Sequence, residues 1–343
     1  MHGSGRCIAA TEVGTSRLSH RLIRVLRWCL AAVLLACAAV LLAYRVKDPE
    51  LRRLDDAARA GAPGRFVRLA DGVTHYETAG PDGGRVVVLA AAFSVPAYIS
   101  DSLFQQLADS GFRVIRYDYF GRGWSDRPDA VYDQDCFVRQ LAGLLDSLRI
   151  TTAVDVAAIS FGAAIVTSFA DRHPDRVRSL IFVDPVFNTG RPLRPEERSA
   201  LAWDVHMVFR GGSDEMATGQ LFDFLHPDRH PDWVARYRVQ QQFKGTREAL
   251  RRTRAAIAVA PHQAEQLRRL GAHPRPVLIV WGRDDQVSPF TGSGALLAAM
   301  PRATLVPVDS AAHLPHLEQP GVVVPAVVRF LRSPARPAGG MPR

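Results

Sequence analysis

The sequence has few cysteines and little that suggests a metal or cofactor site. Of four cysteines in 343 residues, three lie near the N-terminus and only Cys136 lies in the rest of the chain. That rest must therefore fold without an internal disulfide, and we interpret Cys136 as a small buried apolar residue. No Cys/His group has metal-ligand spacing, and no G-x-G-x-x-G loop is present to hold a phosphate. We expect neither a metal nor a cofactor.

The sequence also lacks the charge pattern of a nucleic-acid-binding protein. The formal net charge is +9, but residues 1–62 hold ten Lys/Arg and five Asp/Glu, which leaves +4 for the other 281 residues. No basic run alternates with aromatic residues, so we do not expect a nucleic-acid partner. A hydrophobic content of 47% is sufficient for a large core. The oligomeric state is left open.

One long hydrophobic run stands out against these absences. Residues 28–44 form an uncharged segment of 17 residues, which as a helix is about 25 Å long, at the short end of a membrane span. We predict a single-pass anchor over 28–44 after a basic tail at 1–27. A cleaved signal peptide and a lipoprotein signal at Cys37 are the alternatives. Arginines flank both ends, and translocating the arginine-rich tail is unfavourable, so we expect an exported main domain.

Apolar strands alternate with amphipathic helices beyond a charged linker at 45–64. This alternation predicts an α/β domain over 65–332, with a mostly parallel sheet and helices on both faces, followed by a disordered tail at 333–343. The sheet opens with an antiparallel pair around Asp71-Gly72. The other expected strands are 85–91, 112–118, 153–159, 179–184, 276–281 and 303–308.

A helical segment at 186–270 interrupts the alternation after a central strand. Its position predicts a lid over the carboxyl edge of the sheet, where open α/β sheets bind ligands. Aromatic residues are scattered through it, among them Trp203, Phe209, Phe222, Phe224, Trp233, Tyr237 and Phe243. We expect most of them to pack the lid helices against one another.

Ser160 lies where a strand pattern changes to a helix pattern. The segment A-I-S-F-G places Ala158 two residues before the serine and Gly162 two residues after it. Small residues at these positions allow the sharp strand-to-helix turn that presents a nucleophilic serine. Short apolar stretches contain such residues by chance. The interpretation therefore depends on the strand pattern before Ser160 and the helix pattern after it.

Three further segments support this interpretation by their order and spacing along the chain. "GFRVIRYDYFGRGWSDRP" (111–128), "VLIVWGRDDQVSP" (277–289) and "AAHLPHLEQP" (311–320) are similar to segments of the α/β-hydrolase fold superfamily. The chain from about 65 to 332 resembles the lidded, esterase/lipase-like branch of that superfamily. The resemblance implies a serine hydrolase without a cofactor.

The resemblance implies a catalytic triad of Ser160, Asp285 and His313. In this order the serine is the nucleophile, the histidine takes its proton, and the aspartate orients the imidazole and stabilises its cation. Asp284 and Asp184 are alternative positions for the acid. We interpret His316 as a packing histidine, and Gly121 and Gly123 as parts of a tight loop. We interpret Asp126 either as a turn residue or as a residue that supports the site from behind.

The oxyanion hole departs from the pattern of the superfamily. Ala91 and Ala92 stand where relatives usually carry His-Gly, and the resemblance implies the backbone N–H groups of Phe93 and Phe161 as the donors. Losing one such donor costs about 3 kcal/mol in the transition state. Activity therefore depends on whether Ala92 adopts the backbone conformation that glycine allows.

These features predict a membrane-anchored serine hydrolase that cleaves ester-type acyl bonds through an acyl-enzyme. The apolar lid favours a hydrophobic acyl substrate, including a lipid reached from the bilayer. A C–C bond hydrolase of the same fold is the enzymatic alternative. A non-catalytic ligand-binding or scaffold protein is the alternative from another class, and the Ala91-Ala92 pair supports it.

Overall fold

The computed structural model describes residues 13–188, 190 and 192–333. The chain divides into two compact units, Met1–Asp48 and Pro49–Arg343. Apart from Ser333, the predicted disordered tail lies outside the described residues.

The first unit holds one long helix, α1 (Val13–Lys47). Its segment Arg21–Lys47, 27 residues, is long and apolar enough to cross a membrane. The helix begins well before the apolar run, so the second half of the predicted tail at 1–27 is helical. The reason is local, because no proline or glycine lies between Thr15 and Lys47 to interrupt a helix.

An eight-stranded sheet forms the centre of the second unit. Its strand order is β1-β2-β4-β3-β5-β6-β7-β8. The first two pairings are antiparallel and the other five are parallel, which confirms the predicted mostly parallel sheet. The strands are β1 (Arg65–Leu69), β2 (Gly72–Ala79), β3 (Val86–Ala90), β4 (Arg113–Tyr117), β5 (Val154–Ile159), β6 (Val177–Val183), β7 (Val277–Gly282) and β8 (Thr304–Val308).

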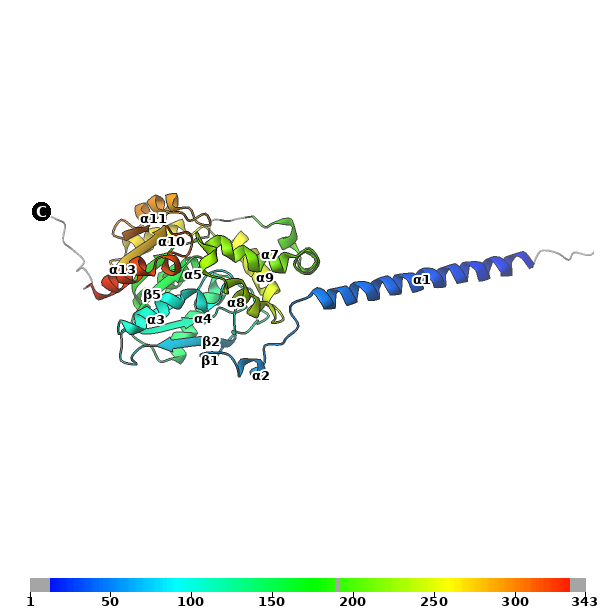
Figure 1. Ribbon diagram of the computed structural model, residues 1–343, viewed down its shortest axis with the longest axis horizontal. Coiled ribbons are helices and arrows are strands. Elements are labelled where there is room, and N and C mark those ends of the chain that lie inside the picture. The colour runs from blue at the N-terminus through cyan, green and yellow to red at the C-terminus, as the bar shows by residue number, and fades with distance from the viewer. Residues whose placement is uncertain (1–12, 189, 191, 334–343) are drawn as a thin grey trace, which may run out of the picture. The chain divides into compact units, whose positions relative to one another are not determined.

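Helices cover both faces of the sheet (Figure 1). Strands β5 and β7 are buried along their whole length, as expected of parallel strands that are covered on both sides. Helix α3 packs against α13, while α4 packs against α5, which also contacts α10. Their bounds are α3 (Asp101–Asp109), α4 (Gln134–Ser147), α5 (Gly162–Arg172), α10 (Ala264–Ala272), α11 (Ser293–Ala299), α12 (Pro315–Glu318) and α13 (Pro320–Arg332).

The segment between β6 and β7 is helical, as predicted for 186–270. We call residues 184–276 the helical insertion. Five of its aromatic side chains are buried, in agreement with a packing role, whereas Phe222 is 82% exposed. Besides α10, its main elements are α6 (Ala200–Asp204), a π-helix (Val205–Phe209), α7 (Gly212–Thr218), the 3₁₀-helix η5 (Gly219–Asp223), α8 (Trp233–Gln241) and α9 (Thr246–Val259).

The predicted linker at 45–64 is wrong from residue 49 onward, because this stretch packs on the domain. The Glu50 carboxylate accepts two backbone N–H groups of the helical insertion. Arg59, at the end of the short helix α2 (Asp56–Arg59), is buried and forms an ion pair with Asp126. Glu50 and Arg59 are thus satisfied by groups distant in the sequence, which composition does not reveal.

Candidate active site

Ser160 occupies the sharp turn between β5 and α5. Its φ is +53°, a left-handed conformation that a residue with a side chain adopts only under constraint. A Cβ on Gly162 would lie 2.6 Å from the Ala91 carbonyl oxygen, so the turn requires glycine at that position. The structure thus shows the strained strand-to-helix turn that the small residues predicted.

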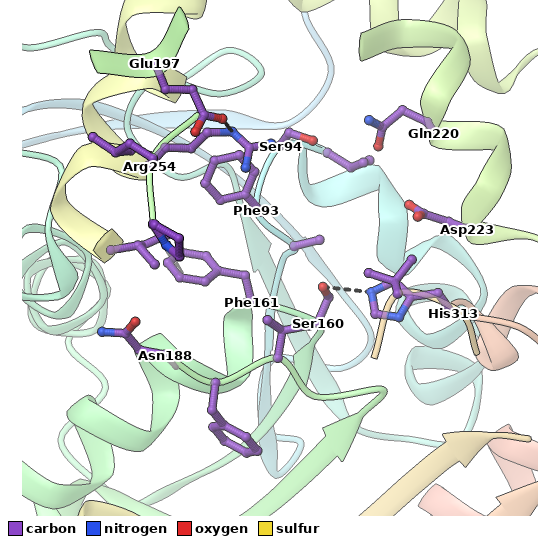
Figure 2. Close-up of a pocket in the computed structure, with 18 residues that line it drawn as sticks. Phe93, Ser94, Ser160, Phe161, Asn188, Glu197, Gln220, Asp223, Arg254 and His313 are labelled. Carbon is purple, nitrogen blue, oxygen red and sulfur yellow. Dashed lines mark hydrogen bonds and ion pairs between the residues drawn. The ribbon is translucent and has the colours of Figure 1, made fainter. Parts of the chain in front are cut away.

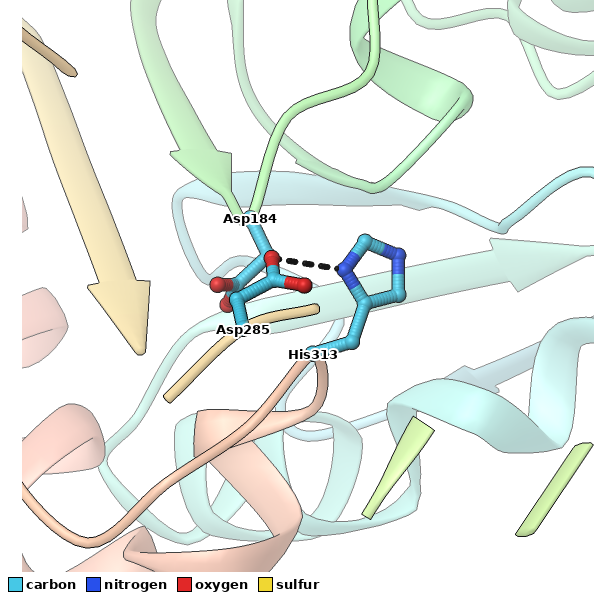
Figure 3. Close-up of side chains that lie close together, drawn as sticks. All are labelled: Asp184, Asp285 and His313. Carbon is cyan, nitrogen blue, oxygen red and sulfur yellow. Dashed lines mark hydrogen bonds and ion pairs between the residues drawn. The ribbon is translucent and has the colours of Figure 1, made fainter. Parts of the chain in front are cut away.

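His313 links Ser160 to Asp285. The Nε2 atom of His313 lies 2.9 Å from the Ser160 Oγ, and its Nδ1 atom lies 2.8 Å from an oxygen of Asp285. Figure 2 shows the imidazole facing the serine, and Figure 3 shows its other nitrogen facing Asp285. All three side chains are nearly buried. The three residues predicted for the triad come from the loops after β5, β7 and β8, whose carboxyl ends meet at one edge of the sheet.

The loop that carries His313 is tied to the helical insertion. The backbone N–H of His313 donates to the Asp223 carbonyl at 3.0 Å. The Glu318 carboxylate accepts the N–H groups of Leu225 and His226 from the insertion, and of Ala312 from the histidine loop. These bonds position the imidazole relative to the wall of the site.

Asp285 is held as an ionised carboxylate. One oxygen accepts the N–H groups of Val287 at 2.8 Å and Ser288 at 2.9 Å, and the other meets His313. Burial alone would raise the pKa of Asp285, but the hydrogen bonds and charge of His313, with these backbone donors, hold it below the usual value. Asp284, the neighbouring alternative, is exposed, and its side chain does not enter the site.

Asp184, the other alternative acid, lies against Asp285 instead of against the serine. It follows β6, is completely buried, and one of its oxygens accepts the Gly282 N–H at 2.9 Å. Burial and the Asp285 charge raise the pKa of Asp184 well above its usual range. Asp184, Asp285 and His313 form the one group in the described part of the chain whose ligand atoms lie close enough to hold a metal ion, within 4.8 Å of one another. A cation there would displace the hydrogen bond between His313 and Asp285.

Two residues that line a cavity with Ser160, namely Phe93 and Phe161, have backbone N–H groups without acceptors. Within the described residues, no acceptor takes the N–H of Phe93 or of Phe161. Neither Ala91 nor Ala92 has a positive φ, so neither needs the backbone conformation that favours glycine. The Phe93 and Phe161 rings pack edge to face at 5.7 Å, which fixes the two segments relative to each other.

A cavity of about 320 Å³ opens in front of Ser160. Figure 2 shows Asp223 and Gln220 on the His313 side, and Arg254 with Glu197 on the other. Arg254 and Glu197 form an ion pair at 3.2 Å. Most of the wall is apolar. The helical insertion supplies Val186, Phe187, Pro192, Leu193 and Ile257, and the rest of the second unit supplies Ala92, Phe93, Val95, Phe161 and Val287.

Sequence reasoning missed the polar residues of this cavity. Asp223 lines it beside His313, and burial raises the pKa of its carboxyl to about 6, although the His313 charge acts to lower it. Asp223, Glu197 and Arg254 lie in the insertion, where no motif marks them. Their charge was also no signal, since charged residues on short helices are usually solvated.

The remaining sequence interpretations concern residues outside the cavity. His316 is completely buried and its Nε2 bonds to the Ile99 carbonyl, as a packing histidine does. Asp126 accepts the Val73 N–H and pairs with Arg59. Cys136 is fully buried.

A second histidine–aspartate pair, which sequence reasoning did not single out, lies away from the cavity. His75 Nδ1 is 2.8 Å from an Asp118 oxygen, and both side chains are buried.

The comparison with protein families agrees with this geometry. The family model described as "alpha/beta hydrolase fold" matches residues 87–320, which is most of the second unit. The chain belongs to the α/β-hydrolase family. Of the elements described above, this match spans β3 to β8, Ser160, Asp285 and His313.

Individual relatives of this α/β-hydrolase differ in their activities. A 2-hydroxymuconate semialdehyde hydrolase from Pseudomonas sp. (strain CF600) is 30% identical over 236 residues, which cover 64% of this chain and 76% of that protein. A non-heme chloroperoxidase from Streptomyces lividans is 26% identical and covers 78% of this chain and 99% of its own. Among solved structures, a thermophilic esterase from Thermogutta terrifontis matches with a TM-score of 0.66 and 25% identity, over 78% of this chain and 98% of that one.

Proposed function

We propose that this α/β-hydrolase is a serine hydrolase that cleaves ester-type acyl bonds of a hydrophobic substrate. The observation that carries the proposal is the chain of hydrogen bonds from Asp285 through His313 to Ser160, which ends at a cavity. A serine hydroxyl is a weak nucleophile until a base accepts its proton, and this chain supplies the base and its orienting acid.

In the proposed reaction the Ser160 Oγ attacks the acyl carbonyl carbon while its proton passes to His313 Nε2. The carbonyl oxygen becomes an oxyanion, for which the N–H groups of Phe93 and Phe161 are the proposed donors. His313 then gives the proton to the departing alcohol, which leaves an acyl group on Ser160. Water, deprotonated by His313, attacks this acyl-enzyme and releases the acid.

The cavity supports an acyl group that is mainly hydrophobic. Its walls include apolar side chains such as Val186, Ile257 and Val287. Binding of a hydrophobic acyl group would remove these side chains from water, which lowers the free energy. The helical insertion supplies part of these walls, so we propose that it acts as a lid that sets which acyl groups enter.

A C–C bond hydrolase is the second candidate, because 2-hydroxymuconate semialdehyde hydrolases are among the relatives. Such an enzyme would use the same three residues. The charged groups of the cavity, Asp223 and the Arg254–Glu197 pair, are compatible with a substrate more polar than a long-chain ester.

Labelling with a fluorophosphonate probe tests the proposed nucleophile. We expect the full chain to be labelled and the Ser160→Ala variant not to be labelled. Ser94→Ala is the matched control, because Ser94 lines the same cavity and should not be the site of labelling. Absence of labelling in the natural chain, or equal labelling of Ser160→Ala, would favour the non-catalytic alternative.

Turnover of two substrate types separates the two enzymatic candidates. We expect hydrolysis of p-nitrophenyl esters, with kcat/KM rising with acyl chain length until the cavity is filled. Turnover of a vinylogous diketone without turnover of any ester would establish the C–C hydrolase instead.

We also propose that α1 anchors the protein in a membrane as a single span, with the N-terminus in the cytoplasm and the catalytic unit exported. The length and composition of Arg21–Lys47 support the span. External protease applied to intact cells should remove the catalytic unit. Its protection until the cells are opened would place the unit in the cytoplasm.

A further inference from the structure

Asp184 is a buried acid to which the proposed reaction assigns no role. It directly follows β6 and has φ +44°, one of four non-glycine residues with positive φ in the described chain. Its backbone N–H donates to the Val280 carbonyl at 3.0 Å, and its Oδ1 accepts the Gly282 N–H at 2.9 Å. The main chain of two strand ends therefore fixes the position and direction of this carboxyl group.

The second oxygen of Asp184 has no donor. Oδ2 is buried and has no hydrogen-bond partner among the residues that the structure describes. Figure 3 shows the two carboxyl groups side by side, with the His313 ring beyond Asp285. Among the described residues Asp184 takes part in no ion pair, and the charges of Asp285 and Glu318 both act to raise its pKa. A buried carboxylate oxygen without a donor or a cation is costly.

Two adjacent buried carboxyl groups do not both ionise, because their like charges repel in a poorly solvated site. Three donors favour ionisation of Asp285, namely Val287 N–H, Ser288 N–H and His313. Asp184 has one, from Gly282. The proton of the pair therefore belongs on Asp184, and burial and the Asp285 charge raise the pKa of Asp184 accordingly.

We propose that Asp184 is a positioning residue that carries a proton on Oδ2 and donates it in a hydrogen bond to the Asp285 carboxylate. This bond satisfies the orphaned oxygen and gives Asp285 one more fixed donor. It holds the carboxylate in the orientation that His313 needs, and it keeps Asp285 a weak base, so that the proton taken from Ser160 stays on the imidazole. The effect on turnover rests on the proposed function, whereas the protonation of Asp184 does not.

Infrared spectroscopy tests the protonation directly. At about pH 8, an ordinary aspartate with a pKa near 4 is ionised and lacks the carbonyl stretch of a carboxylic acid. We expect that stretch in the natural protein and in Ser160→Ala, and its loss in Asp184→Asn. Asp155→Asn is the matched control, because Asp155 is equally buried but its carboxylate is paired with Arg85, so the stretch should persist. Absence of the stretch from the natural protein overturns the proposal.

Turnover tests the positioning role. Asparagine can accept from Gly282 through its oxygen and donate to Asp285 through its nitrogen, whereas alanine does neither. We expect Asp184→Asn to lower kcat about threefold, and Asp184→Ala about 10- to 100-fold with little change in KM, as for other residues that orient a functional ligand.

Two outcomes of that measurement overturn the positioning role. A loss of about 10⁴-fold in Asp184→Asn would identify Asp184 as the ionised acid of the triad. A destabilised Asp184→Ala that retains its kcat would show a purely structural role. If Asp184→Ala does not fold, the infrared result and the kcat of Asp184→Asn still decide the matter.

Discussion

Two histidine–aspartate pairs in this protein have the same hydrogen bond and different partners beyond it. In both, Nδ1 of the histidine lies 2.8 Å from a buried aspartate oxygen. The Nε2 of His313 faces the Ser160 hydroxyl, which can donate a proton. The Nε2 of His75 faces the Pro63 carbonyl at 2.7 Å, which can only accept one.

This difference decides the charge of each ring. Since Asp118 and the Pro63 carbonyl both accept, His75 satisfies them by carrying protons on both nitrogens. Burial alone would lower the pKa of His75, but the Asp118 charge and hydrogen bonds raise it above its usual value. His313 has to accept from Ser160 and donate to Asp285, which a neutral ring does. An orienting acid is common to both pairs, and the group at Nε2 distinguishes a potential base from a structural cation.

The largest expected effect comes from removing each histidine. We expect His313→Gln to lower kcat on a p-nitrophenyl ester by about 10⁴-fold or more, because the base is lost. His75→Gln should change kcat less than tenfold and lower the midpoint of thermal unfolding, because Asp118 then stays buried without its cation. Equal losses of kcat in the two variants, at equal folded fractions, would contradict the distinction.

Replacing Asp285 should mainly lower kcat and replacing Asp118 should mainly lower stability, as for the two histidines. Asp285→Asn is expected to lower kcat about 10⁴-fold through the wrong imidazole tautomer, with little loss of stability. Asp118→Asn should cost about 3–5 kcal/mol of unfolding free energy, because it leaves the His75 charge buried and unpaired. Asp118 also accepts the N–H groups of Ala97 and Trp124. Denaturant titrations alongside kinetics measure both quantities.

Two glycines allow a matched test of the surroundings of each pair. A Cβ on Gly123, which has φ +48°, would lie 2.1 Å from an Asp118 oxygen, and one on Gly162 would lie 2.6 Å from the Ala91 carbonyl. Gly123→Ala should cost about 3 kcal/mol of stability. Gly162→Ala should lower kcat about 100-fold, since it displaces the segment that carries the Phe93 N–H. If the kinetic loss followed Gly123→Ala instead, the assignment of the two sites would be wrong.

The smallest expected effect is on the pH dependence of stability. Because the pKa of His75 is raised on folding, its stabilising contribution is complete below about pH 6.5 and is lost as the pH rises through its folded-state pKa. His75→Gln should remove this decline.

His316 has the opposite effect on stability. Burial lowers the pKa of His316 to about 4, so stability falls as the pH drops from about 6.5 towards that value. Thermal unfolding from about pH 5 to 8, in detergent, measures both slopes; an unchanged slope in His75→Gln would refute its assigned charge.

The strands and the turn at Ser160 were predictable because their signals are local, whereas Asp285 and His313 were predicted from the resemblance of their segments to a known family. A mostly apolar run such as β5, followed by small residues around Ser160, specifies a buried strand and a sharp turn within a dozen residues. The packing of residues 49–64 was not predictable, because it depends on the pairing of Glu50 and Arg59 with groups distant along the chain. The charged groups of the cavity are hidden for the same reason.

By itself, the sequence determined the alternation of strands and helices and the apolar segment near the N-terminus, because periodicity and residue type act over short distances. The order of Ser160, Asp285 and His313 followed from the resemblance of three short segments to a known family. Only the tertiary structure decided which carboxyl meets His313, what stands at the other nitrogen of each buried histidine, and that Asp184 lies against Asp285. Those outcomes depend on loops after different strands converging at one sheet edge. Burial there removes water, so the nearest neighbour sets each group's charge.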